Sequence, residues 1–547
     1  MNDKLTRRAF LGVTGTAALT LAACGGNAPA PADDGGEAPA DDGGEAPADD
    51  GGSAAVVGGG TMTVGSAYGP SSFDPQNCSS AFCLSANMNV MEGLYDIDFH
   101  DYSVSDGLCV GDPVWVDDNT CEITLRDGAA FSTGDPVTPE DVIHSFERAK
   151  ADGMMYVSFL TMIESIEKKD DKTLTVKVTI PQFSLIKERL GIIKVTPATL
   201  SDDDAAAKPI GTGPWMYDEM SDTYVTLVPN PNYNGNHPAR DNALRIDSMT
   251  DPTARVTAQS EGTTVVTESV PPDSIAQLEG IGCKVDQVQG FGTRFIMFNV
   301  KKAPWDNKNA RQAVMYALNT DNMIQNAFSG LAGKPDCYLP GSFTAHHTAS
   351  TVYTYDVAKA QELANGIEFP ATIELRTTDN AQVVSMGTQA QQDIQTAFGV
   401  TVNLTSDQSP ATYAAIDQAD DSWDILIAPG DPSCFGGDTD LLLNWWYGDN
   451  IWMKTRCAWN TSDEWKKVNE LMATALTQTG ADQQNSWNEV FDIIADNCVL
   501  YPVLQVITPT GYWDAATGAS PSGVCIEGFS GIGTTGVALA DTATVTA

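Results

Sequence analysis

The stretch that most restricts the fold lies between residues 25 and 60, where a short unit repeats with almost nothing to bury. Pro31–Ala38 reads Pro-Ala-Asp-Asp-Gly-Gly-Glu-Ala and recurs in the next two octets, with Ser53 replacing the last glutamate. A segment without aromatic or large aliphatic side chains cannot offset the entropy lost on folding. We therefore predict a flexible tether over 24–60, with a reach of roughly 30 to 35 Å, and a folded body that begins at Thr61.

The residues before the tether have the layout of an export signal. Basic residues Lys4, Arg7 and Arg8 precede an apolar stretch that ends in Leu21-Ala-Ala-Cys24, and 1–23 is therefore predicted to be a signal peptide. Leu-Ala-Ala-Cys resembles the lipobox of bacterial lipoproteins, which implies that Cys24 is lipidated. The paired arginines followed by Phe-Leu resemble a twin-arginine signal for folded proteins, with an ordinary secretion signal as the alternative.

The body is long, acidic and moderately apolar. From Thr61 onward it is too long for one core, so two or three domains are expected. The whole chain carries a formal charge of −42, a field that repels nucleic acid and anionic lipid. The body holds no apolar run of about 18 residues, so no spanning helix is expected there.

Ten cysteines follow Cys24, and none forms a Cys-x-x-Cys pair. No Cys/His grouping has zinc-like spacing either, so we expect no metal site. In an exported chain their even number suggests disulfides, with Cys78–Cys83, Cys109–Cys121 and Cys434–Cys457 as natural local pairs. Buried free thiols are the alternative, and the sequence does not decide the pairings.

Periodicity along the body predicts strands that alternate with helices. A strand is expected at Thr61–Ala67, and an alternating strand at Cys121–Leu125. Thr138-Pro-Glu-Asp141 should cap a helix, and residues 165–180 should form a hairpin. Further strands are predicted at 294–299, 371–376, 400–405 and 424–428, and further helices at 356–365, 386–397 and 463–476. This order indicates an α/β architecture with largely parallel pairing.

Several stretches, taken in series, resemble the family 5 solute-binding proteins, the peptide and nickel receptors of ABC importers. The stretches are Glu92-Gly-Leu-Tyr95, Thr124-Leu-Arg-Asp-Gly128 with Phe131, Gly134-Asp-Pro-Val-Thr138 with Asp141-Val142, Pro209-Ile-Gly-Thr-Gly-Pro-Trp215, Asn230-Pro-Asn-Tyr233, Phe298-Asn299 with Pro304, Arg311-Gln-Ala313 with Tyr316-Ala317, and Tyr355-Asp356 with Lys359-Ala360.

The resemblance implies a bilobal, periplasmic-binding-protein-like α/β fold with an extra domain inserted in the first lobe. A hinge between the lobes would enclose ligand in a cleft. On this basis lobe I is expected at 61–105, 208–290 and 509–547, the inserted domain at 106–207, and lobe II at 291–508.

The resemblance also implies candidate binding residues. In the family's peptide receptors an aspartate after a lobe II strand holds the peptide α-amino group, and Asp431 is the best positional match. It lacks the flanking aromatic residues of the family pattern, and a solvated turn aspartate is the alternative; Asp438 and Asp440 are weaker competitors. The loop containing Ser79, Ser80, Ala81 and Phe82 matches the place where the family offers backbone to ligand, unless it is a surface loop pinned by Cys78–Cys83. Of Trp445 and Trp446 at most one should line a pocket, and we select Trp445, with packing as the alternative.

Other motifs carry less weight. Gly531-Ile-Gly-Thr-Thr-Gly536 fits the dinucleotide glycine pattern, but too few residues follow it for the helix and strand that the motif needs. We interpret it as a terminal loop. The adjacent His346 and His347 could help bind a nickel chelate or haem, although a loop reading is favoured. No nucleophile elbow, His-Glu-x-x-His or Walker sequence is present.

The sequence thus predicts a lipid-anchored, monomeric receptor that is not an enzyme and needs no cofactor. It would lie on the outer face of the cytoplasmic membrane, bind oligopeptides and deliver them to an ABC permease, with no nucleic-acid partner. The alternatives are the same fold binding a nickel chelate, haem or another solute, and an exported enzyme that folds around a cofactor.

Overall fold

The computed structural model describes residues 59–78, 80–151, 154, 156–418, 422–518, 520–532 and 543–546. The chain divides into two units, Met1–Ser53 and Ala54–Ala547, and everything described belongs to the second. The predicted signal peptide, Cys24 and the tether lie outside the described residues. No helix in the described ranges is long and apolar enough to cross a membrane.

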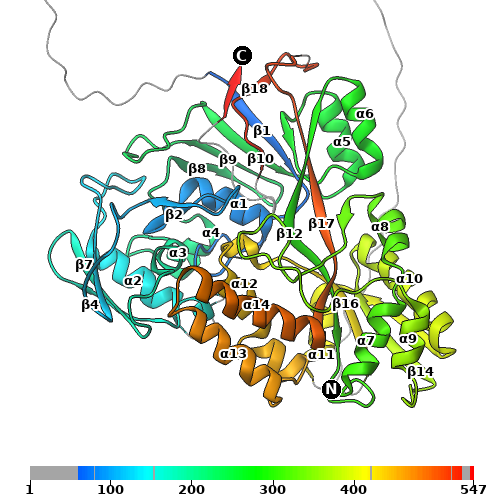
Figure 1. Ribbon diagram of the computed structural model, residues 1–547. Helices are drawn as coiled ribbons and strands as arrows, with labels where there is room; N and C mark the ends of the chain where they lie inside the picture. Colours follow the sequence, from blue (N-terminus) through cyan, green and yellow to red (C-terminus); the bar gives the residue numbers. More distant parts are fainter. Residues whose placement is uncertain are drawn as a thin grey trace, which may run out of the picture. The chain divides into compact units, whose positions relative to one another are not determined.

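A single large sheet of eleven strands organises the described part of the chain (Figure 1). Its strands, in spatial order, are β15 (Thr401–Asp407), β14 (Thr372–Thr378), β16 (Ile425–Gly430), β12 (Lys284–Phe298), β17 (Leu500–Tyr512), β11 (Val266–Thr267), β1 (Thr61–Ser66), β10 (Ala243–Ser248), β9 (Tyr224–Pro229) and β8 (Trp215–Met220), with β13 (Ala332–Gly333) paired to β17.

The predicted α/β class is confirmed, but the expectation of largely parallel pairing is wrong. β1 is parallel to β10 and β11, and β14 is parallel to β15 and β16. The other pairs in the large sheet are antiparallel. The order of strands and helices along the chain sets the fold class, whereas pairing direction depends on which distant strands become neighbours.

Two long strands connect the two halves of this sheet. The first part of β12 pairs with the end of β17, and its last six residues pair with β16 on the other edge. The pairing of β12 with β17 shifts register between Gln289 and Thr293, where Gly290–Gly292 form a bulge. A bulge bends a strand and increases its local twist, so the sheet changes direction at Gly290–Gly292.

A separate four-stranded antiparallel sheet lies within the segment predicted as an insertion. It contains β4 (Val114–Asp117), β5 (Thr120–Thr124), β7 (Thr173–Val178) and β6 (Ile163–Lys168), in that order. The predicted alternating strand and hairpin are confirmed as β5 and as β6 with β7. Two smaller sheets pair β2 (Tyr95–Ile97) with β3 (Val104–Asp106) and β18 (Cys525–Glu527) with β19 (Thr544–Thr546).

The helices follow the predicted order. They are α1 (Ala81–Val90), α2 (Pro139–Ala149), α3 (Ile186–Ile192), α4 (Asp202–Ala207), α5 (Pro252–Ser260), α6 (Ile275–Gly280), α7 (Lys308–Ala317), α8 (Thr320–Phe328), α9 (Val357–Leu363), α10 (Ala381–Phe398), α11 (Ser409–Asp417), α12 (Thr439–Tyr447), α13 (Asp463–Ala475) and α14 (Gly480–Asn497). The cap predicted for α2 is confirmed, because Asp141 Oδ2 accepts hydrogen bonds from the backbone N–H and the hydroxyl of Thr138, at 2.9 and 2.7 Å.

The state of the cysteines differs from the expectation of local disulfides. All ten cysteines of the body are free thiols, and all except Cys434 are buried. The three suggested local disulfides are therefore absent from the described residues. Each buried thiol fills core space as a small apolar side chain, which was the alternative interpretation.

Candidate functional site

The candidate site begins where β16 ends. Asp431 follows Gly430 and caps the short 3₁₀ helix η3 (Pro432–Phe435). Its Oδ1 accepts hydrogen bonds from the backbone N–H of Ser433, at 3.0 Å, and from the Ser433 hydroxyl, at 2.5 Å. Oδ2 lies toward β12, where a Cβ added to Gly292 would stand 3.3 Å from it. The Asp431 carboxylate is thus held over the bulged strand that connects the two halves of the sheet.

The Asp431 carboxylate makes no ion pair with any cation in the described ranges. Burial raises its pKa to about 6, against the lowering effects of the Ser433 hydrogen bonds and of Arg294. A carboxylate without a cation in a desolvated setting is stabilised by any cation placed against it. The predicted role of Asp431 in holding an ammonium group stays a prediction.

The other half of the sheet carries a partly exposed tyrosine directly after β1. Tyr68, just after β1, is 45% exposed, yet burial raises the pKa of its phenol, and Glu268 and Asp431 raise it further. The Glu268 carboxylate accepts the Ser66 hydroxyl at 2.5 Å and the Ala67 N–H at 2.6 Å, which fixes the segment that carries Tyr68. The Tyr68 side chain stays partly exposed on a segment that Glu268 holds in place.

The two competing aspartates are engaged elsewhere. Asp438 caps α12 by accepting the Leu441 N–H at 2.8 Å. Arg189, on α3, is 1% exposed and pairs with both carboxylates, with 2.8 Å between Nη2 and Asp440 Oδ2. Asp440 also accepts the Asn444 side chain at 2.7 Å. Both acids therefore serve a buried ion cluster, and of the three candidates only Asp431 has no cation against it.

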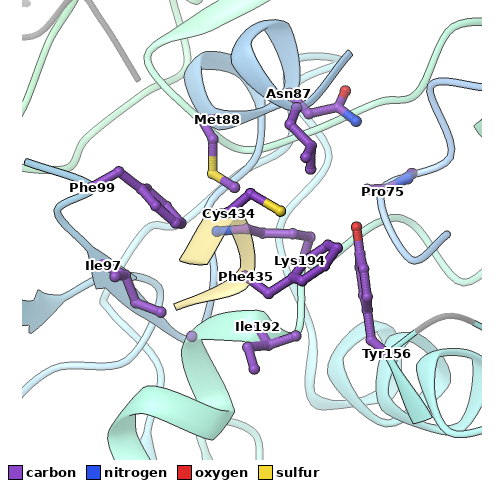
Figure 2. A pocket seen from close by; sticks show the side chains of 12 residues that line it. Pro75, Asn87, Met88, Ile97, Phe99, Tyr156, Ile192, Lys194, Cys434 and Phe435 are labelled. Atoms are coloured by element: carbon purple, nitrogen blue, oxygen red, sulfur yellow. The ribbon is translucent and has the colours of Figure 1, made fainter. Parts of the chain in front are cut away.

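A pocket lies next to the turn that Asp431 begins. Its cavity volume is about 30 Å³. Figure 2 shows Cys434 and Phe435 of η3 surrounded by side chains from α1, from the β2 region, from the end of α3 and from Tyr156. Apolar side chains supply most of the lining, and Lys194 carries a pKa lowered by burial. In this structure the pocket has room for little more than one water-sized group.

Trp445 packs near this pocket without lining it. Its ring lies 5.5 Å from that of Phe435 and 6.0 Å from that of Phe159. Trp446 is fully buried against Phe291 and Phe295. The expectation that adjacent tryptophans face different environments is confirmed, whereas a ligand contact by Trp445 stays a prediction.

Of the loop before α1, Ser79 lies outside the described residues. Ser80 precedes the helix and donates its hydroxyl to the Gly69 carbonyl at 2.7 Å. Phe82 is fully buried, with its ring 6.4 Å from that of Phe73. Ala81 and Phe82 stand in the first turn of α1, so only their backbone could serve a ligand, and that role stays a prediction.

The adjacent histidines and the glycine-rich terminal motif form no further site in the part of the chain that the structure describes. His346 pairs with Asp336 at 2.9 Å, and His347 lies 3.5 Å from Asp492. Within the described ranges no group of three or more His, Cys, Asp or Glu residues is placed to hold a metal ion. Of the glycine-rich terminal motif, Gly533 to Gly536 lie outside the described residues.

Sequence reasoning did not single out Tyr68 or Arg294. Tyr68 stands in a turn-rich stretch after the first strand, and Arg294 is the charged residue of an otherwise apolar strand end. A charged side chain within such a strand was a usable signal. Arg294 lies opposite Pro429 through the pairing of β12 with β16, which the sequence does not display.

Comparison with known proteins matches this chain to a family. The profile of bacterial extracellular solute-binding proteins, family 5, middle region, matches residues 110–467. A Brucella ovis protein named as an ABC transporter peptide-binding protein is 26% identical over 306 residues, which cover 53% of this chain and 57% of that protein. The chain thus spans somewhat over half the length of these Brucella relatives. The glutathione-binding protein GsiB of Salmonella paratyphi A is 23% identical, over 83% of this chain and 91% of its own.

Solved structures share the fold. DppA of Helicobacter pylori, in complex with the peptide STSA, aligns with a TM-score of 0.73 at 20% identity, over 89% of this chain and 98% of its own. The dipeptide-binding protein of Pseudoalteromonas sp. SM9913, in complex with Met-Leu, aligns with a TM-score of 0.74 at 18% identity, over 89% of this chain and 100% of its own. NikA of Staphylococcus aureus, in complex with Ni(L-His)2, aligns with a TM-score of 0.72 at 16% identity, over 89% of this chain and 100% of its own. At these identities the likeness concerns the fold alone.

Proposed function

This chain belongs to the bacterial extracellular solute-binding proteins of family 5, and from that premise we propose that it is the receptor of an ABC importer for oligopeptides. It would capture a peptide outside the cytoplasm, enclose it and release it unchanged to the permease, so no catalytic step is required.

The observation that carries this proposal is the isolated carboxylate of Asp431. It stands at the end of β16, is fixed by Ser433, has no cation paired with it in the described ranges, and has a pKa raised to about 6 by burial. A peptide α-ammonium would supply the missing positive charge through a charge-assisted hydrogen bond. Every oligopeptide with a free N-terminus carries that group, which suits a receptor of broad specificity.

The remaining parts of the proposal concern how the ligand is enclosed. We place lobe I at 61–105, 208–290 and 509–547, an inserted domain at 106–207, and lobe II at 291–508. The boundaries at 290 and 508 fall within β12 and β17, and the bulge of β12 at Gly290–Gly292 offers a hinge. Backbone near Ser79 to Phe82 and the ring of Trp445 complete the proposed binding surface.

We further propose that the protein is held at the membrane by lipid on Cys24 after export, with the acidic tether as spacer. Two lines support this: the Leu-Ala-Ala-Cys motif, and the need of a receptor to stay close to its permease. Cells that express the chain with radiolabelled palmitate should label it, and Cys24→Ala should remove both label and membrane association. Replacing Arg7 and Arg8 by lysine should block export if the twin-arginine route is used. A label on the Cys24→Ala variant would refute the anchor.

The direct test of the ligand class compares a free tripeptide with its N-acetylated form by calorimetry, in wild type and in Asp431→Asn. Loss of one charge-assisted hydrogen bond costs about 1.5 to 3 kcal/mol, or about 10-fold to 150-fold in affinity. We expect acetylation to weaken wild-type binding by such a factor, and Asp431→Asn to weaken free-peptide binding equally. Asp218→Asn, an exposed carboxylate on β8, is the matched control and should bind as wild type does.

The outcomes separate the alternatives. If acetylation leaves the affinity unchanged, the ammonium site is elsewhere. If peptides do not bind and a nickel chelate or haem does, the fold serves another solute.

A further inference from the structure

The hairpin of β2 and β3 holds an aromatic side chain against the segment that follows Asp431. The ring centroids of Tyr102, at the tip of this hairpin, and of Phe343 lie 5.6 Å apart. Gly437 comes closer still, because a Cβ added to it would stand 2.2 Å from Cγ of Tyr102. Only a residue without a side chain fits at position 437 in this arrangement. The hairpin tip is therefore packed directly against the turn between η3 and α12.

The backbone of the hairpin tip is strained and held in place. Tyr102 has a φ of 60°, a left-handed conformation that is uncommon outside glycine. The Asp98 carbonyl accepts the Tyr102 N–H at 2.6 Å, and the Asp98 N–H donates to the Ser103 carbonyl at 2.9 Å. Asp101 Oδ1 accepts the Ser103 N–H at 2.8 Å. A strained residue that the surrounding structure fixes in this way points to a role for its side chain.

The residue after Gly437 is held by a second element from the first part of the chain. Asp438 accepts from Arg189 on α3, with 2.8 Å between Oδ1 and Nη2. Arg189 is 1% exposed, and it also pairs with Asp440. Two consecutive residues, 437 and 438, therefore contact the hairpin tip and α3.

These contacts lie beside the pocket of the candidate site. Phe99, from the same hairpin tip, lines that pocket together with Cys434 and Phe435 of η3 (Figure 2). The cavity volume of about 30 Å³ leaves room for little more than one water molecule, which is far less than a peptide needs. A peptide can therefore enter this pocket only if the hairpin tip and the turn between η3 and α12 move apart.

We propose that the hairpin tip at 98–103 is a clasp that keeps the empty receptor closed, and that ligand enters only when Tyr102 leaves Gly437. This inference rests on the proposed function and on the proposed lobe boundaries, by which the tip belongs to lobe I and residue 437 to lobe II. When only a fraction of the molecules is open, ligand association is slowed by that fraction. Weakening the clasp should therefore speed association.

The first test follows the clasp without ligand, through the thiol of Cys434. N-ethylmaleimide labels a thiol faster when the thiol is more accessible, and mass spectrometry of the digested full chain gives the rate at each cysteine. Gly437 has no left-handed backbone, and the nearest atoms to its added Cβ all belong to the Tyr102 ring. Gly437→Ala should therefore displace the ring and label Cys434 about 5-fold to 150-fold faster, the range expected from overpacking a filled site.

Further variants assign the effect to this contact. Tyr102→Ala removes the ring from the other side and should also speed the labelling of Cys434, and Gly437→Ala should add nothing in that background. Gly341→Ala, at a glycine whose added Cβ would meet no neighbour within 4 Å, is the matched control and should label as wild type does. The buried Cys109 should label at the wild-type rate in every variant. A rise at Cys109 in Gly437→Ala would report unfolding, and Tyr102→Ala would then decide the matter.

The second test adds trialanine and measures its association rate by stopped-flow tryptophan fluorescence. We expect Gly437→Ala to raise that rate by the same factor as the labelling of Cys434, because both depend on the fraction of open molecules.

The results distinguish the clasp from the function on which it rests. If Gly437→Ala and Tyr102→Ala label Cys434 no faster than wild type, the clasp proposal fails whatever trialanine does. If labelling speeds up but trialanine associates no faster, ligand does not enter past the hairpin tip and the proposal also fails. If labelling speeds up and trialanine binds to no variant and not to wild type, the clasp stands and the peptide receptor proposal fails.

Discussion

Replacement of Glu268 by glutamine should change how the stability of the protein depends on pH. Glu268 is 2% exposed, and burial raises the pKa of its carboxyl from 4.5 to about 7 despite hydrogen bonds from Ser66 and Ala67. Because the folded state holds the proton more tightly than the unfolded state, Glu268 favours folding at low pH. That advantage is complete below about pH 4.5 and is lost as the pH rises through about 7.

The magnitude follows from the two pKa values. The pKa of Glu268 is raised by about 2.5, and each pKa unit corresponds to about 1.4 kcal/mol. The ionised carboxyl therefore costs the folded state at most about 3.4 kcal/mol. About 2.5 kcal/mol of this cost should develop between pH 5 and pH 8. Glutamine cannot ionise and keeps an oxygen that can accept the Ser66 and Ala67 hydrogen bonds, so Glu268→Gln should lose this part of the pH dependence.

The assay is urea unfolding of wild type and variant at several pH values between 5 and 8. Glu279→Gln, an exposed glutamate on α6, is the control and should run parallel to wild type. The difference in unfolding free energy between Glu268→Gln and wild type should grow by about 2.5 kcal/mol in favour of the variant from pH 5 to pH 8. Parallel curves for Glu268→Gln and wild type would refute the reasoning.

Three further predictions concern the site and its surroundings. Affinity for a free dipeptide should fall as the pH drops below about 6, because protons compete with the ligand ammonium for Asp431; calorimetry at pH 5 and 7 checks this, and a similar fall in Asp431→Asn would contradict it. Arg189→Met should lower the unfolding free energy by about 3 to 5 kcal/mol, because it leaves two buried carboxylates without their cation; a loss below about 1 kcal/mol in urea unfolding would show that the cluster is not buried as described. Gly430→Ala should cost about 1 to 3 kcal/mol, since its Cβ would stand 2.5 Å from the Trp446 ring; a Tm equal to that of wild type would count against this packing.

Local sequence signals identified much of the fold. The Thr138 cap, the alternation in β5 and the hairpin of β6 and β7 depend on residues close in sequence, and all three are present as predicted. The full length of β12 and its pairing with β17 depend on contacts between segments about 200 residues apart. The same limit explains why parallel pairing was overestimated: β1 takes its two parallel neighbours from strands far along the chain.

In the candidate site, too, local sequence signals identified only part of the arrangement. Asp431 could be proposed from its place after a predicted strand. The engagement of Asp438 and Asp440 could not, because their cation, Arg189, lies some 250 residues earlier. Arg294 comes close to the end of β16 through its pairing with β12, and no local pattern in the sequence connects it to Asp431.

The most direct test of the receptor proposal uses protein purified from its native cells without denaturation. Native mass spectrometry shows whether the protein carries a ligand, and acidification then frees that ligand for identification. The account predicts oligopeptides with free N-termini, bound without chemical change. Acid release is expected because protonation of Asp431 removes the charge that holds the ammonium. A tightly held redox cofactor, a nickel chelate or haem in their place would contradict the claim that this protein is a peptide receptor.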